Sequence, residues 1–184
     1  HQVAYWWEDG KLMPALHGYG SNATGITVYD GKVYITGYYK DNNKMKAALW
    51  INGAEETIDL PAGKESRITD IAIADGTVYL SGYYYENTEN IACYWKNGTL
   101  HVLAAPSGST HYRASKIALH GNDINITGET DTINGSSVDT FYRPLWWKNG
   151  TLENIELPMN ISRARAFGMT VDENGNVYFA GYYD

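Results

Sequence analysis

The stretch DGTVYLSGYY at residues 75–84 decides the fold of this 184-residue chain, because it recurs along the sequence. It returns as DGKVYITGYY at residues 30–39 and as NGNVYFAGYY at residues 174–183, and a shortened copy, NITGET, lies at residues 125–130. An Asp-Gly or Asn-Gly pair beside alternating apolar residues is typical of a β-hairpin, because both central residues of a type I′ turn need positive φ. The stretch therefore predicts a repeated hairpin.

A second marker, a tryptophan followed by a turn, alternates with the first. It occurs as WEDG at residues 7–10, WING at 50–53, and WKNG at 95–98 and 147–150, so its period is 43 to 52 residues. Each period holds two hairpins, which predicts a four-stranded antiparallel meander. No segment shows the 3.6-residue apolar spacing of a helix, so we expect almost no helix.

Four-stranded meanders repeated at this period are typical of a β-propeller. We predict an all-β fold, a β-propeller of four 4-stranded antiparallel blades, in a single domain over residues 1–184. The chain opens with two expected outer strands, residues 3–7 and 12–16, and ends with two expected inner strands, residues 168–171 and 177–183. We expect these halves to pair, closing the ring and covering two open edges.

The YWKNGT element at residues 94–99 and the G-x-V-Y-x-x-G-Y-Y element resemble the repeats of β-propellers in secreted or surface-anchored bacterial proteins. The resemblance covers the whole chain and implies an extracellular or cell-surface location, but these motifs are structural and imply no activity. Most such propellers have about six to eight blades, whereas this chain has repeats for four. It closes alone, as hemopexin-like domains do, or two copies share strands, or it belongs to a longer chain; we favour the first.

Composition excludes several classes of partner. The formal charge is −7 and the pI about 5.2, which argues against nucleic acid. No apolar run reaches the roughly 18 residues of a membrane span. Cys93 is the single cysteine, so neither an intrachain disulfide nor a multi-cysteine zinc site is expected.

We expect any binding site on the face that carries the long connections, at residues 17–24, 61–67, 104–115 and 158–167. Four residues on this face each stand three positions before the start of an inner-strand motif: Asn22, Arg67, Arg113 and Arg165. The motif after Arg67 starts at Asp70, and the motif after Arg113 starts at Lys116. A ring of guanidinium groups could bind a carboxylate, sulfate or phosphate. The interpretation that we favour, however, is that each arginine ties neighbouring blades together, through carbonyls or carboxylates such as Asp70.

Aromatic residues outside the repeats suggest sugar binding, because Tyr and Trp rings stack on sugar faces while their polar groups form hydrogen bonds. Tyr19, Tyr112 and Tyr142 lie in or beside the long loops, and we select Tyr19, His111 and Tyr112 as the candidates for stacking and hydrogen bonding. We therefore predict a non-catalytic binding or interaction module, a monomer or homodimer, that recognises carbohydrate, protein or another anionic ligand on the long-loop face. The alternatives are a structural protein whose blades are shared between chains, and an unrecognised hydrolase.

Motifs of catalysis and of metal or cofactor binding are missing from the sequence. There is no His-Glu-x-x-His, no Gly-x-Ser-x-Gly and no phosphate-binding glycine loop before a helix. Asp172 and its neighbours lack the spacing of a calcium loop and are typical of a hairpin turn. We predict no catalytic residue, no metal and no cofactor.

Overall fold

The computed structural model describes residues 2–109, 111–133, 140–159, 161 and 163–184. Strands are the only regular elements in this part of the chain, which confirms the all-β prediction. It contains no helix with the length and apolar character that a membrane span requires. The third repeat carries an insertion in the sequence from Asp131 to Phe141, and residues 134–139 of it lie outside the described part of the chain.

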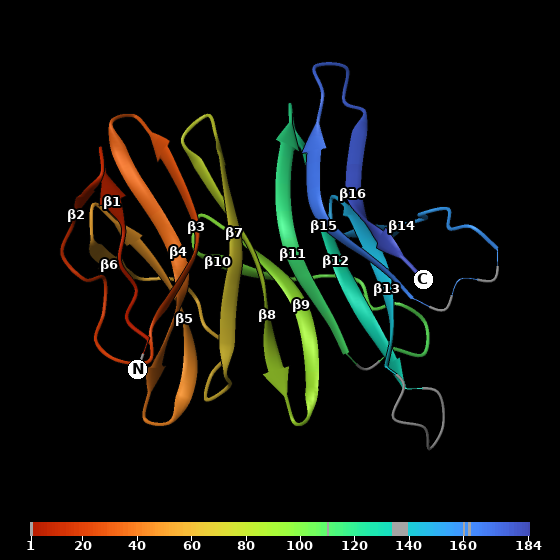
Figure 1. Ribbon diagram of the computed structural model, residues 1–184, viewed down its shortest axis with the longest axis horizontal. Helices are drawn as coiled ribbons and strands as arrows, with labels where there is room; N and C mark the ends of the chain where they lie inside the picture. The colour runs from red at the N-terminus through yellow and green to blue at the C-terminus, as the bar shows by residue number, and fades with distance from the viewer. Residues whose placement is uncertain (1, 110, 134–139, 160, 162) are drawn as a thin grey trace.

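The strands group into three complete four-stranded antiparallel units and two terminal hairpins (Figure 1), and a parallel bridge between Asn90 and His111 joins two of the units into one eight-stranded sheet. The N-terminal hairpin consists of β1 (Trp7–Glu8) and β2 (Lys11–Leu12), and the C-terminal hairpin of β15 (Ala164–Val171) and β16 (Val177–Tyr183). The complete units consist of β3 (Asn22–Tyr29), β4 (Lys32–Asp41), β5 (Lys44–Ile51) and β6 (Ala54–Glu56); β7 (Ser66–Ala74), β8 (Thr77–Glu86), β9 (Glu89–Lys96) and β10 (Thr99–Val102); and β11 (His111–His120), β12 (Asp123–Ile133), β13 (Thr140–Lys148) and β14 (Thr151–Glu153).

The expected turns are present. Asn97 and Gly98 both have positive φ, 46° and 81°, and join β9 to β10. Asp75 and Gly76 do the same between β7 and β8, with φ of 48° and 73°. The type I′ turn therefore sets the register of these hairpins, as the sequence predicts.

The core lies between neighbouring sheets rather than within one. One buried cluster joins Leu49 of the β3–β6 unit to Ile68 and Leu80 of the β7–β10 unit, and a second joins Ala92 to Ile117 of the β11–β14 unit. The packing also repeats: β7 lies against β3, β4 and β5, β11 against β7, β8 and β9, and β15 against β11, β12 and β13. Each first strand thus packs on the first three strands of the preceding unit.

A buried tryptophan lies at the centre of every complete unit. Trp50, Trp95 and Trp147 are each 0% exposed. The indole N–H of Trp95 donates to the Asp59 carbonyl at 2.6 Å, and that of Trp147 donates to the Ala104 carbonyl at 2.8 Å. These carbonyls belong to the connections that enter the β7–β10 and β11–β14 units, so Trp95 and Trp147 bind a connection as well as a sheet; the buried indole N–H of Trp50 has no hydrogen-bond partner among the described residues.

Glycines on the second strands give these tryptophans room. A Cβ added to Gly82 would lie 2.1 Å from the Arg67 carbonyl oxygen and 2.9 Å from Cζ3 of Trp95. At Gly128 the corresponding distances are 2.0 Å to the Arg113 oxygen and 2.8 Å to Trp147. No side chain fits at these positions without moving backbone, which explains the invariant glycine of the four repeats.

A β-bulge lies at the same place in all four first strands, and in two of them the side chain of the extra residue reaches the next unit. The extra residues are Thr24, Thr69, Ser115 and Phe167. Thr24 Oγ1 donates to the Ile68 carbonyl at 2.7 Å, and Thr69 Oγ1 donates to the Ala114 carbonyl at 3.0 Å, in each case in the following unit. These hydroxyls therefore tie neighbouring units.

The expected pairing between the two terminal hairpins is not present. In the described residues β1 pairs with β2 and β15 with β16, each as a separate two-stranded sheet. The two hairpins lie at opposite ends of the longest axis of the molecule (Figure 1). Strand order predicts which strands are complementary, but the distance between the ends depends on the packing angle between sheets, which the sequence pattern does not contain.

The tight contact at Gly82 gives a first prediction. We expect Gly82→Ala to lower the free energy of unfolding by about 3 kcal/mol, because the added methyl must displace the Arg67 carbonyl or the Trp95 ring. Gly18→Ala is the matched control, since an added Cβ there meets nothing within 4 Å, and it should change stability by less than about 0.5 kcal/mol. Urea denaturation of both variants measures this; equal stabilities would contradict the packing described.

The bulge hydroxyls give a second prediction. Thr69→Val keeps the side-chain shape but removes the hydroxyl, which lies 3.0 Å from the Ala114 carbonyl of the next unit and 3.1 Å from the Ser81 carbonyl of its own unit, so we expect a loss of about 1 kcal/mol in the free energy of unfolding. Thr99→Val, at an exposed position on β10, is the control and should be near neutral. A Thr69→Val variant as stable as the control would show that this hydroxyl does not tie the units.

Candidate functional site

The predicted polar set occupies equivalent positions on the first strands. Across the first hairpin of each repeat, Asn22 lies opposite Tyr38, Arg67 opposite Tyr83, Arg113 opposite Glu129 and Arg165 opposite Tyr182. All four stand near the strand end that follows a long connection. The set is therefore placed at one end of the sheets, on the long-loop face.

Each arginine contacts the same position of the preceding unit. The guanidinium carbon of Arg67 lies 4.7 Å from the centre of the Tyr38 ring, and that of Arg113 lies 5.9 Å from the Tyr83 ring. Tyr38 and Tyr83 are equivalent in the repeat, and Glu129 holds this position in the shortened copy. Arg165 accordingly makes a bidentate pair with Glu129, at 2.7 and 2.8 Å.

Two of the three arginines have carboxylate partners. Besides Glu129, Arg165 contacts the Tyr142 ring at 4.5 Å, and its hydrogen bonds to Glu129 raise its pKa above the usual value. Arg113 donates to Asp131 Oδ2 at 3.0 Å. These contacts satisfy the charge of both guanidinium groups. The Arg165–Glu129 pair crosses to the preceding unit and favours the interpretation that the arginine ties units together, whereas Asp131 belongs to the same unit as Arg113.

Arg67 differs from both. In the described part of the chain it forms no ion pair, and its buried Nε has no hydrogen-bond partner. Its guanidinium lies between two rings, 4.7 Å from the centre of Tyr38 and 6.0 Å from that of Tyr85. Burial raises the pKa of the nearby Tyr83 to about 12, although Arg67 opposes this, so the Tyr83 hydroxyl stays neutral at physiological pH.

A cavity of about 560 Å³ adjoins this arginine through Tyr85. It is lined by Lys44, Gly63, Lys64 and Glu65 from β5 and the connection before β7, together with Tyr85 and Asn87. Lys44 Nζ donates to the Gly63 carbonyl at 2.8 Å, and Lys64 pairs with Glu86. The cavity thus brings together an aromatic ring, two ammonium groups, one of them paired with Glu86, and the carboxylate of Glu65, while Arg67 lies beside it and does not line it.

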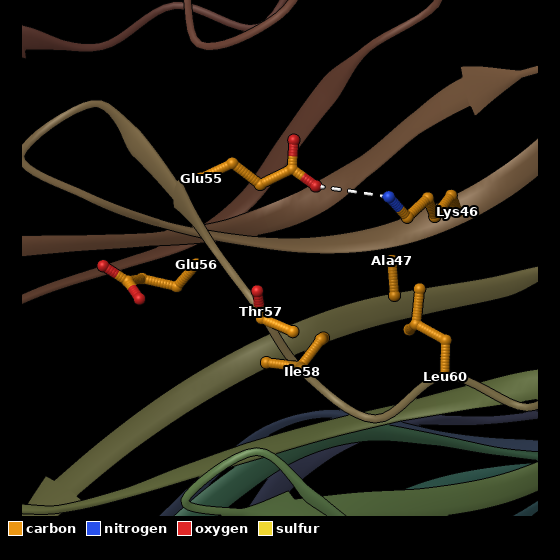
Figure 2. A pocket seen from close by; sticks show the side chains of 7 residues that line it. All are labelled: Lys46, Ala47, Glu55, Glu56, Thr57, Ile58 and Leu60. Carbon is orange, nitrogen blue, oxygen red and sulfur yellow. Dashed lines mark hydrogen bonds and ion pairs between the residues drawn. The ribbon is translucent and has the colours of Figure 1, made fainter.

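A second pocket, of about 200 Å³, lies beside β5 and β6 (Figure 2). Its ammonium group is already engaged: Lys46 Nζ donates to the Tyr39 hydroxyl at 2.6 Å and lies 3.5 Å from Glu55. The hydrogen bond to Tyr39 raises the pKa of Lys46, which therefore stays charged. Figure 2 shows the Lys46 amine directed at Glu55, so this pocket offers no free cation to an anion.

The remaining predicted residues do not gather at Arg67. Tyr112 is buried in the core between units, and burial raises its pKa. His111 Nδ1 accepts from the Asn90 backbone N–H at 3.3 Å, beside the one parallel bridge between the β7–β10 and β11–β14 units. Tyr19 is exposed in the connection before β3.

Lys116 and Asp70 form another contact between units. Lys116 Nζ lies 3.6 Å from Asp70 Oδ1, and Asp70 Oδ2 accepts from the Ile117 N–H at 3.2 Å. Asp70 thus binds a lysine and a backbone amide of the next unit, not an arginine. Both residues serve the packing between sheets.

The sequence analysis missed three residues of this site: Tyr38, Tyr83 and Tyr85. Two of them belong to the repeated Tyr-Tyr pair, and their recurrence indicated packing alone. A usable signal was present in the shortened copy, where Glu129 replaces the first tyrosine. That replacement marks the position that contacts the arginine of the next unit.

The described residues give little support for metal binding or for thiol chemistry. No three His, Cys, Asp or Glu side chains in that part are grouped closely enough to hold a metal ion. Cys93 is buried, and burial raises its pKa well above the usual value, so its thiol is unreactive. The Asp172 carboxylate accepts from the Asn174 and Asn176 N–H groups and from the Tyr178 hydroxyl, as a hairpin turn requires.

Comparison with known proteins adds no family: no family model matches the chain, and no curated protein sequence matches it. The functional conclusion therefore depends on the repeats and on the contacts described above.

The turn at Asp172 gives a third prediction, in its pH dependence. Hydrogen bonds from Asn176 and Tyr178 lower the Asp172 pKa from 3.8 to about 2. Because the folded pKa lies below the unfolded one, these bonds stabilise the protein above about pH 4, and the effect is lost as the pH falls through about 2. We expect Asp172→Asn to melt at a lower temperature than the wild type at pH 7.

The difference in melting temperature should shrink between about pH 4 and pH 2. Glu173→Gln, which removes the adjacent exposed charge, is the control and should show no such trend. Thermal melts in a pH series measure both variants. A difference that is constant with pH would contradict the stated role of the carboxylate.

Proposed function

We propose that the chain is a non-catalytic, β-propeller-type binding module that acts outside the cell or on its surface. In this proposal the sheets are propeller blades, and the ligand is an acidic carbohydrate bound on the long-loop face. The repeated packing of each first strand on the preceding unit supports the propeller arrangement. The resemblance to secreted bacterial propellers supports the location.

One observation carries the ligand class: Arg67 is held between two tyrosine rings without a carboxylate partner among the described residues. A guanidinium binds a carboxylate through two parallel hydrogen bonds. Stacking on Tyr38 and Tyr85 fixes its orientation before a ligand arrives, which lowers the entropic cost of binding. The orphaned Nε of Arg67 is the kind of donor that an anion or a water would satisfy.

The surroundings of Arg67 favour a sugar acid over a bare anion. Tyr85 lines the adjoining cavity of about 560 Å³, so a pyranose ring can stack there while its carboxylate reaches the guanidinium. Lys44 and Lys64 line the same cavity with Glu65; Lys64 is paired with Glu86, so Lys44, which donates to the Gly63 carbonyl and forms no ion pair among the described residues, is the cation that favours an anion there. Arg113 and Arg165 already hold carboxylates, so we assign the ligand to Arg67 and not to a ring of three arginines.

Isothermal titration with a glucuronate-containing oligosaccharide and its glucose counterpart tests this proposal. We expect the acidic sugar to bind more tightly, and Arg67→Ala to weaken its binding about tenfold or more, since hydrogen bonds to charged groups contribute about 1.5–3 kcal/mol. Arg143→Ala is the control: it removes an equal charge, but its guanidinium donates to the Ile161 carbonyl on another part of the protein. Both variants must first melt like the wild type.

Equal affinity for the two sugars, or an Arg67→Ala variant that binds as tightly as Arg143→Ala, would contradict the proposal. Arg67→Lys separates charge from geometry. It should bind the acidic sugar with intermediate affinity, because an ammonium keeps the charge but loses the two parallel hydrogen bonds.

A further inference from the structure

The two terminal hairpins are complementary halves of one repeat unit. β1 and β2 correspond to the third and fourth strands of a complete unit, because Trp7 aligns with Trp50, Trp95 and Trp147. β15 and β16 correspond to the first and second strands, because they carry the NGNVYFAGYY copy. The chain therefore contains all four strands of another unit, in two separate places.

Each half exposes apolar residues that complete units bury. Trp7 is 62% exposed, whereas its three equivalents are 0% exposed. Tyr183 on β16 is 63% exposed, and its equivalent Tyr84 is 9% exposed. The missing strands, rather than a change in residue type, account for this exposure.

The strand next to the N-terminal hairpin is uncovered as well. Ile26 on β3 is 58% exposed, whereas Ile71 on β7 and Ile117 on β11 are 8% and 6% exposed. The first three strands of the preceding unit cover β7 and β11. For β3, the equivalent three strands would be a first and a second strand, like β15 and β16, with β1 as the third. Tyr5, Trp7 and Ile26 line a pocket of about 370 Å³ where that inner pair would lie.

The C-terminal hairpin has a matching hollow. A pocket of about 210 Å³ is lined by Pro144 and Leu157 and by β16 from Phe179 to Tyr183, and its walls are largely apolar. In complete units the third strand pairs with the second strand, along the edge that β16 leaves open. Each of the two pockets thus lies where the strands of the other terminal hairpin would complete the unit.

Three complete units fix the register in which the halves would join. The tryptophan lies opposite Ile35, Leu80 or Ile126 in each of them. By equivalence, Trp7 would lie opposite Phe179, and Glu8 opposite Tyr178. The Trp7 ring would then approach Gly181, where the absence of a side chain leaves the space that Gly82 leaves for Trp95.

We propose that a second copy of this chain supplies the missing half: β16 of one copy pairs with β1 of the other to form a composite four-stranded unit. This inference goes beyond the proposed ligand binding. The hairpins lie at opposite ends of the molecule, so a chain in this conformation presents each half to another copy and not to itself (Figure 1). The contact is heterologous, and two copies that form it twice make a closed ring of six complete and two composite units.

Disulfide trapping tests the register and the source of the strands. Glu8 and Tyr178 are both exposed, and Cys93 is kept because it is buried and unreactive. Glu8→Cys and Tyr178→Cys proteins are prepared separately, mixed and mildly oxidised. We expect a disulfide-linked pair of chains in the mixture and little in either protein alone. Lys11→Cys with Tyr178→Cys is the control; Lys11 lies on β2, one strand further from β16, and should not link.

Two outcomes overturn the proposal. One is a mixture that cross-links no more than the Lys11→Cys control does. The other is a double Glu8→Cys, Tyr178→Cys chain that forms its disulfide internally and stays at the mass of one chain, which would show closure within a single copy.

A charge at Trp7 provides an independent test. Trp7 is exposed in the single chain, so Trp7→Lys should leave the thermal unfolding of a dilute sample unchanged. We expect it to abolish association in sedimentation velocity, because a lysine would be buried in the composite unit. Val102→Lys, at an exposed apolar position on β10, should associate like the wild type. A Trp7→Lys protein that associates like the control would overturn the proposal.

Discussion

The structure depends on one packing constraint: the tryptophan on the third strand of each complete unit is fully buried, and in two of the units it packs against a glycine on the second strand. Gly82 and Gly128 show how little room this contact leaves, since an added methyl would lie within 3 Å of both backbone and indole atoms. The indole N–H groups of Trp95 and Trp147 also hold the connection that enters each unit. A unit that lacks half of its strands leaves its tryptophan in solvent, as Trp7 shows. Such an exposed ring is a strong driving force for association, because burial of an aromatic side chain contributes about 1.5–3 kcal/mol.

The repeat-equivalent charged residues differ in whether they have a partner of opposite charge among the described residues. Arg113, Arg165, Lys116 and Asp70 all have partners of opposite charge, and the Arg165 and Lys116 pairs cross from one unit to the next. Arg67 shares their position in the repeat but contacts tyrosines where the shortened repeat supplies Glu129 to Arg165. Arg113 pairs with Asp131 of its own unit and Arg165 with Glu129 of the preceding one, whereas Arg67 has Tyr85 and Tyr38 at the equivalent positions. One repeat position accommodates both arrangements because a guanidinium stacks on rings as readily as it pairs with carboxylates.

Much of the fold is predictable from the sequence, because turn chemistry and strand alternation are local. The Asn97-Gly98 and Asp75-Gly76 turns, the four-stranded units and the equivalence of Arg67, Arg113 and Arg165 all follow from the repeats. Three features do not. Tyr112 lies in the core because a neighbouring sheet covers it. Arg67 lacks a carboxylate partner among the described residues because a tyrosine, Tyr38, faces it across the boundary between two sheets. The terminal hairpins stay apart because of the angles between the sheets. Each depends on contacts between units, which a pattern within one repeat does not encode.

The central claim is that a complete four-stranded unit is the smallest arrangement that buries the repeat tryptophan, so the two half-units of this chain are complementary surfaces. Small-angle X-ray scattering over a concentration series tests it most directly. We predict a particle of twice the 20.5 kDa chain mass whose scattering fits a flat ring rather than an elongated body. A particle that keeps the mass of one chain and an elongated shape at every concentration would contradict the account.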